Sequence, residues 1–180
     1  MPAHPNDIVG YWKQAGPQKW FKKLVAFDEA IRLKFEPVHH AAARGEYDAW
    51  AGSAEGALAL LILLDQFPRN LYRNSAHAFA TDPKARSIAL AAVDKGFDRQ
   101  ADPALRNFFY LPFEHSENLT DQDYSLALCT EAGNPDSLKW AAIHRDIIVR
   151  FGRFPHRNAA LGRVTTPQEQ EFLDEGGFAG

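Results

Sequence analysis

The pattern of apolar and polar positions along the chain predicts a series of helices. Apolar side chains recur every four residues at Phe27, Ile31 and Phe35, within a stretch that Gly45 can end as a helix stop. No segment alternates strictly between apolar and polar residues, and the Asn-Gly and Asp-Gly turns typical of hairpins are missing. Because helical segments follow one another with short connections, the sequence predicts an all-α fold of roughly eight to ten helices.

Four dipeptides mark expected helix starts. Each places a capping residue directly before a proline, and proline is favoured at the first position of a helix because it needs no N–H partner there. The last of them, at Thr166, is followed three residues later by a glutamate, as in a capping box. We therefore expect helices to begin within two residues of Pro83, Pro103, Pro135 and Pro167.

The most apolar stretch is the run from Ala57 to Leu64. A helix that is apolar on every side is buried on every side, and the Leu and Ala content favours a core helix over the alternative, a central strand. The run is shorter than the about 20 residues that cross a bilayer, and the start of the chain does not resemble a secretory signal. The sequence predicts one helical domain over residues 1–180, in the cytoplasm and without a membrane partner.

Composition narrows the classes of partner. The formal net charge of −3 gives no reason to expect nucleic acid as a partner. The single cysteine, Cys129, excludes an internal disulfide and lies in an apolar stretch, which predicts a buried, inert thiol. No pattern of residues predicts a metal site or a cofactor.

Two similar corners carry the most distinctive polar residues, at positions 65–70 and 153–158. In each, Phe-Pro follows an apolar segment and is expected to break its helix, and Arg and Asn come directly after. Asp65 stands at the carboxyl end of the most apolar segment, where a carboxylate needs a partner. We expect the two corners to lie side by side with Asp65 bonded to an arginine. The plainer interpretation of this pairing is a structural ion pair.

Other polar residues have two interpretations each. The segment Glu114 to Glu117 places two carboxylates and an imidazole within four residues, as acid–base chemistry would need. Its plainer interpretation is a solvated helix start. His144 falls on an apolar helix face, where a histidine is more often a core residue than an acid or base. The basic residues Arg150, Arg153, His156, Arg157 and Arg163 could clamp a phosphate or carboxylate, or could neutralise nearby carboxylates of the protein.

Several strings of residues resemble one family. They are Leu-Leu-Asp-Gln-Phe-Pro-Arg-Asn (63–70), Ala-Phe-Ala-Thr-Asp (78–82), Leu-Pro-Phe-Glu-His-Ser-Glu (111–117), Phe-Gly-Arg-Phe-Pro-His-Arg-Asn (151–158) and Leu-Gly-Arg-Val-Thr-Thr-Pro-Gln-Glu (161–169). In these the chain resembles the bacterial domain-of-unknown-function family nine-two-four over nearly its whole length. The resemblance implies an all-helical, tetratricopeptide-like array, and it implies no particular activity, substrate or cofactor.

Two functions fit these observations. The first is a binding or scaffold module for a protein or peptide, with a partly buried polar site. The alternative is an enzyme or small-molecule binder for a phosphate or carboxylate ligand. The candidate acid–base residues are Glu114, His115, Glu117 and His156. The candidate ligand-binding residues are Asp65, Gln66, Arg69, Asn70, Arg153, Arg157 and Asn158.

Overall fold

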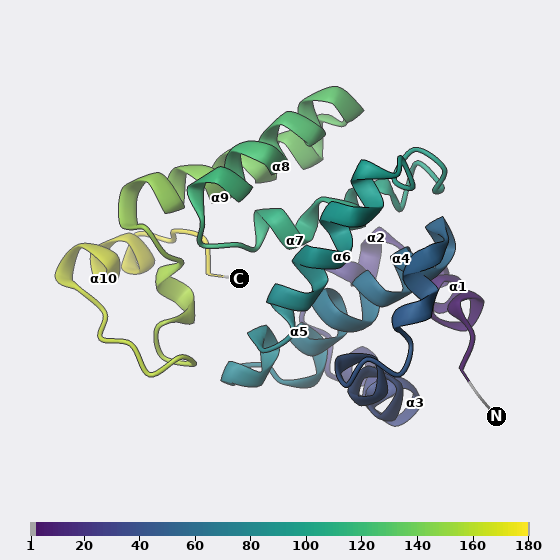
Figure 1. Cartoon of the computed structure of the whole chain (residues 1–180). Helices are drawn as coiled ribbons and strands as arrows, with labels where there is room; N and C mark the ends of the chain where they lie inside the picture. The colour runs from purple at the N-terminus through teal and green to yellow at the C-terminus, as the bar shows by residue number, and fades with distance from the viewer. Residues whose placement is uncertain (1–2, 180) are drawn as a thin grey trace. The chain divides into compact units, whose positions relative to one another are not determined.

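The computed structural model describes residues 3–179, and these residues form helices and loops with no strand (Figure 1). The predicted all-α fold is therefore confirmed. The helices are α1 (Pro5–Ala15), α2 (Pro17–Trp20), α3 (Val25–Ala43), α4 (Ala54–Leu61), α5 (Phe67–Leu71), α6 (Asp82–Asp94), α7 (Leu111–Glu114), α8 (Leu119–Ala132), α9 (Pro135–Phe151) and α10 (Pro167–Asp174). None of the helices in this part of the chain is long and apolar enough to cross a membrane.

The chain divides into two compact units. Unit 1 comprises the described part of Met1–Arg73 together with His77–Pro112, and unit 2 comprises Asn74–Ala76 with the described part of Phe113–Gly180. The single domain over residues 1–180 and the tetratricopeptide-like array stay predictions.

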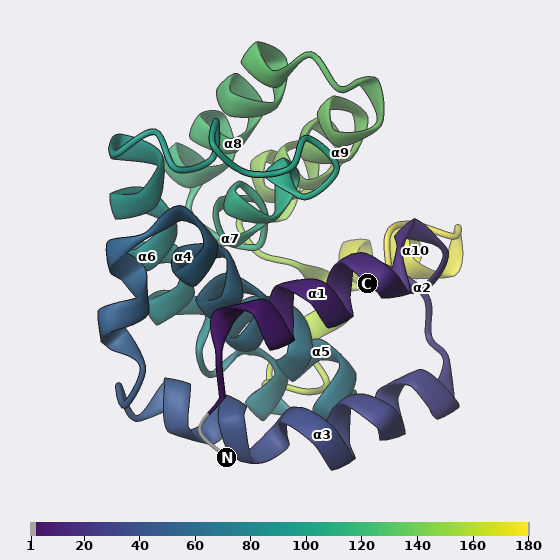
Figure 2. The same ribbon diagram turned by 90° about the vertical axis from the view of Figure 1, so that its right-hand side faces the viewer.

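Unit 1 is built around α4, which lies beside α1 and α6, while α5 lies beside α3 (Figure 2). The side chain of Ser53 caps α4 by accepting a hydrogen bond from the Gly56 N–H. Every residue from Ala57 to Leu64 is buried, which confirms the predicted core helix. Trp12 packs edge-on against Phe67 and Phe108, so aromatic rings fill the space around this helix.

Unit 2 is built on α8 and α9, which pack against each other and are joined by a short connection (Figure 1). Gly133 ends α8 in the left-handed conformation (φ +70°), and the side chain of Asn134 then caps α9. The apolar core of this unit contains Ile147, Ile148 and Phe154. Partly buried apolar side chains from α9, α10 and the C-terminal segment pack against it: Ile143, Phe151, Phe172 and Phe178.

Three of the four predicted helix starts are confirmed, at α6, α9 and α10. The start at Pro103 is wrong, because only a 3₁₀ turn forms there, from Arg106 to Phe109. The Asp102 carboxylate accepts a hydrogen bond from the Ala104 N–H and pairs with Lys13 at 2.6 Å. The Asp102 side chain is therefore engaged in a local turn and by a lysine of α1, and it does not cap a helix.

Candidate functional site

The first corner is a continuous helical turn. The predicted helix break at Phe67-Pro68 is wrong, because a π-helical turn from Ile62 to Gln66 joins α4 directly to α5. Pro68 has no N–H to offer the carbonyl groups four and five residues before it. Side chains donate to these two carbonyl oxygens instead: Leu63 O accepts from His39 Nδ1 (2.8 Å) and Leu64 O from Thr81 Oγ1 (2.5 Å). Arg69 Nη1 also donates to the next carbonyl oxygen, that of Asp65. The proline is therefore tolerated within the helical path.

Asp65 is buried beside this turn, with 1% of its side chain exposed. Gln66 Nε2 donates to its carboxylate at 2.5 Å, and Arg69 Nη1 lies 3.3 Å from its other oxygen. The expected bond to an arginine is present, and the arginine is Arg69. Both terminal nitrogens of Arg69 also donate to Asp82, at 3.0 Å each. Arg69 thus bridges the π-turn and the first residue of α6.

The remaining residues of this corner face α3. Asn70 Nδ2 donates to the Asp28 carboxylate at 2.8 Å, and Arg73 binds both oxygens of Asp28, at 2.6 and 2.9 Å. Asp65, Gln66 and Arg69 are thus linked to α6 through Asp82, and Asn70 is linked to α3 through Asp28.

The second corner, in unit 2, also joins an arginine to the start of a later helix, but this arginine, Arg153, stands before its Phe-Pro pair, whereas Arg69 follows its own. α9 ends at Phe151, where Gly152 adopts a φ of +68°. Arg153 binds Glu169 of α10 through Nε (2.6 Å) and Nη2 (2.8 Å), and Asn158 Nδ2 lies 3.2 Å from the same carboxylate. The hydrogen bonds from Arg153 lower the pKa of the buried Glu169 to about 2. In both corners, the arginine pairs with a carboxylate in the first turn of the next proline-initiated helix.

Glu117 forms a second clamp within unit 2. Its two oxygens accept from Arg163 at 2.7 and 3.0 Å, and it also accepts from the Phe154 N–H at 2.8 Å. Burial would raise the pKa of Glu117, but the bonds to Arg163 and to the Phe154 N–H lower it. Glu117 is therefore an ionised partner of the segment that leads out of the second corner.

Glu114 and His144 form a buried pair, with 2% and 6% of each residue exposed. This rules out the interpretation of Glu114 as part of a solvated helix start. His144 Nδ1 lies 2.9 Å from the Trp140 carbonyl oxygen and 3.1 Å from Glu114 Oε1. Since both neighbours are acceptors, Nδ1 carries the hydrogen and Nε2 holds the lone pair. Burial, followed by the neighbouring His115, lowers the pKa of His144 to about 3.

Several predicted residues gather around His144. The rings of His115, Phe154 and Phe178 lie 6.2, 5.5 and 4.4 Å from its ring centre. His156 in turn contacts Phe178, and the Arg157 guanidinium stands 4.6 Å over Phe154. A neutral histidine with so low a pKa is a weak base near pH 7, so this cluster is better suited to orient side chains than to remove protons.

Cys129 is fully buried near Glu114. Burial, together with the charge of Glu114, raises the pKa of its thiol to about 12. The thiol is therefore inert, as its apolar surroundings in the sequence predict.

The predicted residues are divided between the two units. Asp65, Gln66, Arg69 and Asn70 lie in unit 1, and the others lie in unit 2. That the two corners lie side by side and share one polar site stays a prediction.

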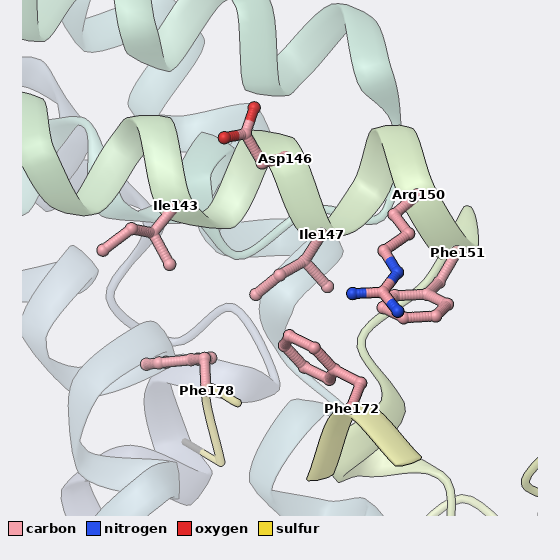
Figure 3. Close-up of a pocket in the computed structure, with 7 residues that line it drawn as sticks. All are labelled: Ile143, Asp146, Ile147, Arg150, Phe151, Phe172 and Phe178. Atoms are coloured by element: carbon pink, nitrogen blue, oxygen red, sulfur yellow. The ribbon is translucent and has the colours of Figure 1, made fainter. Parts of the chain in front are cut away.

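A recess on unit 2 went unnoticed in the sequence. It has a volume of about 230 Å³ and lies between α9, α10 and the C-terminal segment. Figure 3 shows Ile143 and Ile147 pointing from α9 towards Phe178 and Phe172, with Arg150 beside Phe151 and Asp146 turned away. In the sequence, the feature that indicates this recess is a row of apolar residues at helical spacing: Trp140, Ile143, Ile147 and Phe151.

Comparison with known proteins identifies relatives without an assigned activity. The solved structure of a protein of unknown function, ATU0120 from Agrobacterium tumefaciens, is 50% identical in sequence, with a TM-score of 0.93. The match covers 96% of this chain and 97% of that one. No curated protein matches. A model of the family DUF924, described as bacterial protein of unknown function, matches residues 8–177. With its helical fold and both corner motifs inside that range, the chain belongs to the DUF924 family.

Proposed function

We propose that this protein is a binding module that docks an acidic, amphipathic helical segment of a partner protein on the recess of unit 2. The observation that supports this proposal is the recess itself, whose apolar lining is left partly uncovered (Figure 3). Its volume of about 230 Å³ suits one large apolar side chain of a partner.

The face of α9 extends the recess into a stripe. Trp140, Ile143, Ile147 and Phe151 follow one another at spacings of three and four. Trp140 is 45% exposed and Ile143 and Phe151 are half-buried, whereas Ile147 is buried in the core of unit 2. A partner helix can therefore contact Trp140 and Ile143 and place one apolar side chain in the recess beside them.

Charge beside the stripe selects the partner. Arg150 packs over the rings of Phe151 (4.7 Å) and Phe172 (5.5 Å), and it forms no ion pair within residues 3–179. An arginine held on aromatic rings next to an apolar recess favours a carboxylate of the incoming segment. The partner is therefore expected to carry an acidic residue beside its apolar anchor.

The alternative, a phosphate or carboxylate ligand at the predicted arginines, has less support. Two of the three predicted arginines, Arg69 and Arg153, each direct two nitrogens at a carboxylate of the protein itself. The third, Arg157, is buried with its guanidinium 4.6 Å over the Phe154 ring. An anionic ligand would have to compete with carboxylates already fixed at the site.

A designed amphipathic peptide tests the docking proposal. The peptide carries leucines at helical spacing and a glutamate beside the central leucine, and its binding is followed by the fluorescence anisotropy of a dye attached to the peptide. Arg150→Glu should weaken binding by about three- to fivefold, as for a partly exposed ion pair. A peptide with lysine in place of the glutamate should regain affinity for this variant only.

Lys95→Glu is the matched control, because it makes the same change in charge at an exposed position in unit 1. Ile143→Asp, which places a charge in the recess, should abolish binding. Equal binding of the acidic peptide to wild type, Arg150→Glu and Ile143→Asp would show that the recess is not the docking site.

A further inference from the structure

The segment between α2 and α3 exposes large apolar side chains and lysines together. Phe21 is 67% exposed, Leu24 38% and Val25 81%. Between and beside them stand the exposed Lys19, Lys22 and Lys23. No acidic residue occurs from position 19 to 25, although the whole chain has a net charge of −3. We call residues 19–25 the basic tip.

The basic tip is anchored from within by one residue. Trp20 is 9% exposed, its Nε1 donates to the Trp12 carbonyl at 2.7 Å, and its ring meets Phe108 edge-on at 5.0 Å. Because Trp20 points into unit 1, its neighbour Phe21 is held at the surface. The tip is thus a fixed feature of the fold, and the exposure of Phe21 follows from it.

The positive charges of the tip are not neutralised within the described residues. Lys19, Lys22 and Lys23 form no ion pair there, although Lys19 stands 5.7 Å over the ring of Phe27. The nearby carboxylate of Asp28 is held by Arg73 through both oxygens. The lysine charges are therefore available to an external anionic partner.

α3 exposes one further large apolar side chain beyond the tip. Leu33 is 78% exposed and lies eight residues after Val25, which turns it by about 80° around the helix axis. Figure 2 shows the segment leading from α2 into α3 along the outside of unit 1.

Three kinds of partner can be weighed against this surface. A second copy of the chain, paired symmetrically, would bring the same lysines face to face. A nucleic acid would use the lysines and could stack on Phe21, but it has no use for exposed Leu24, Val25 and Leu33. An anionic lipid surface uses both kinds of side chain, since apolar groups enter the boundary of the acyl chains while lysines reach the headgroups.

We propose that the basic tip binds an anionic lipid surface reversibly, with Phe21, Leu24 and Val25 entering the interface and Lys19, Lys22 and Lys23 contacting the phosphate groups. The sequence predicted no membrane partner, so reversible lipid binding by the tip differs from that prediction. Lipid binding also goes beyond the proposed peptide docking, because the basic tip belongs to unit 1 and the recess to unit 2.

Cosedimentation of the full chain with vesicles tests this proposal. Binding is expected to phosphatidylcholine vesicles that contain phosphatidylglycerol and not to phosphatidylcholine alone, and it should weaken as salt is added. Removing one lysine should weaken binding by about fivefold. Lys22→Glu with Lys23→Glu should abolish it, and Phe21→Ser should weaken it without any change in charge.

The matched control is Lys95→Glu with Lys139→Glu, which changes the net charge equally at exposed positions outside the tip. Circular dichroism and thermal melts show whether each variant is folded. The proposal is overturned if anionic vesicles are not bound, if the control weakens binding as much as the tip variant, or if Phe21→Ser binds as well as wild type. Binding to an oligonucleotide that survives Phe21→Ser, with no binding to vesicles, would assign the tip to nucleic acid.

Discussion

Replacing Asp65 with alanine should lower the free energy of unfolding by about 3–5 kcal/mol, as expected when one partner of a buried ion pair is removed. The carboxylate of Asp65 is 1% exposed and accepts from Gln66 beside the Arg69 guanidinium. Its loss leaves polar groups without their acceptor inside the core of unit 1. Denaturant unfolding of wild type and variant measures the difference.

Asp48→Ala is the matched control for this measurement. Asp48 also pairs with a basic residue, Lys84 at 2.7 Å, but its side chain is 60% exposed. An exposed pair contributes about 0–1 kcal/mol, so the control should stay close to wild type. A loss for Asp65→Ala of less than about 0.5 kcal/mol would refute the role of Asp65 as a structural anchor.

Acid should destabilise the protein through His144. The pKa of His144 is lowered to about 3 in the folded protein, against 6.5 for an ordinary histidine. Below pH 6.5 the unfolded chain therefore binds a proton at this side chain that the folded chain does not bind. The free energy of unfolding should therefore fall progressively as the pH is lowered from about 6.5 towards 3.

Urea unfolding at a series of pH values measures this slope. His144→Gln keeps a donor for Glu114 but cannot titrate, so its stability should fall less steeply than that of wild type. The groups around His144 are Glu114, His115, His156 and Arg157, and they are unchanged in this variant. Identical slopes for wild type and His144→Gln would contradict a neutral, buried His144.

Local signals in the sequence predicted most of the fold. Capping residues and prolines located α6, α9 and α10, because these signals act within one turn of a helix. The signal at Pro103 failed because Asp102 is engaged by Lys13, which is 89 positions away. Such a competing contact depends on tertiary structure and leaves no trace in local sequence.

The corners were located from sequence, but their partners were not. The carboxylates that meet Arg69 and Arg153 are Asp82 and Glu169, which lie 13 and 16 residues further along. In the sequence both were assigned to helix capping, and for Glu169 the capping box is also present. Glu169 therefore serves a helix start and an arginine at once. Asp82 does not cap α6, because the N-cap residue is Thr81 and Asp82 is the first residue of the helix. Only the folded arrangement reveals the bonds to the two arginines.

Arg69 and Arg153 bind carboxylates of the protein, and we expect ligand binding to occur on other surfaces. Thermal melts with millimolar phosphate, citrate or a phosphorylated sugar test this expectation, since a ligand that binds the folded state raises the melting temperature. We expect no specific rise for wild type, and a lower melting temperature for Arg153→Ala in every buffer. A rise in wild type that disappears in Arg153→Ala would instead assign this corner to an anionic ligand.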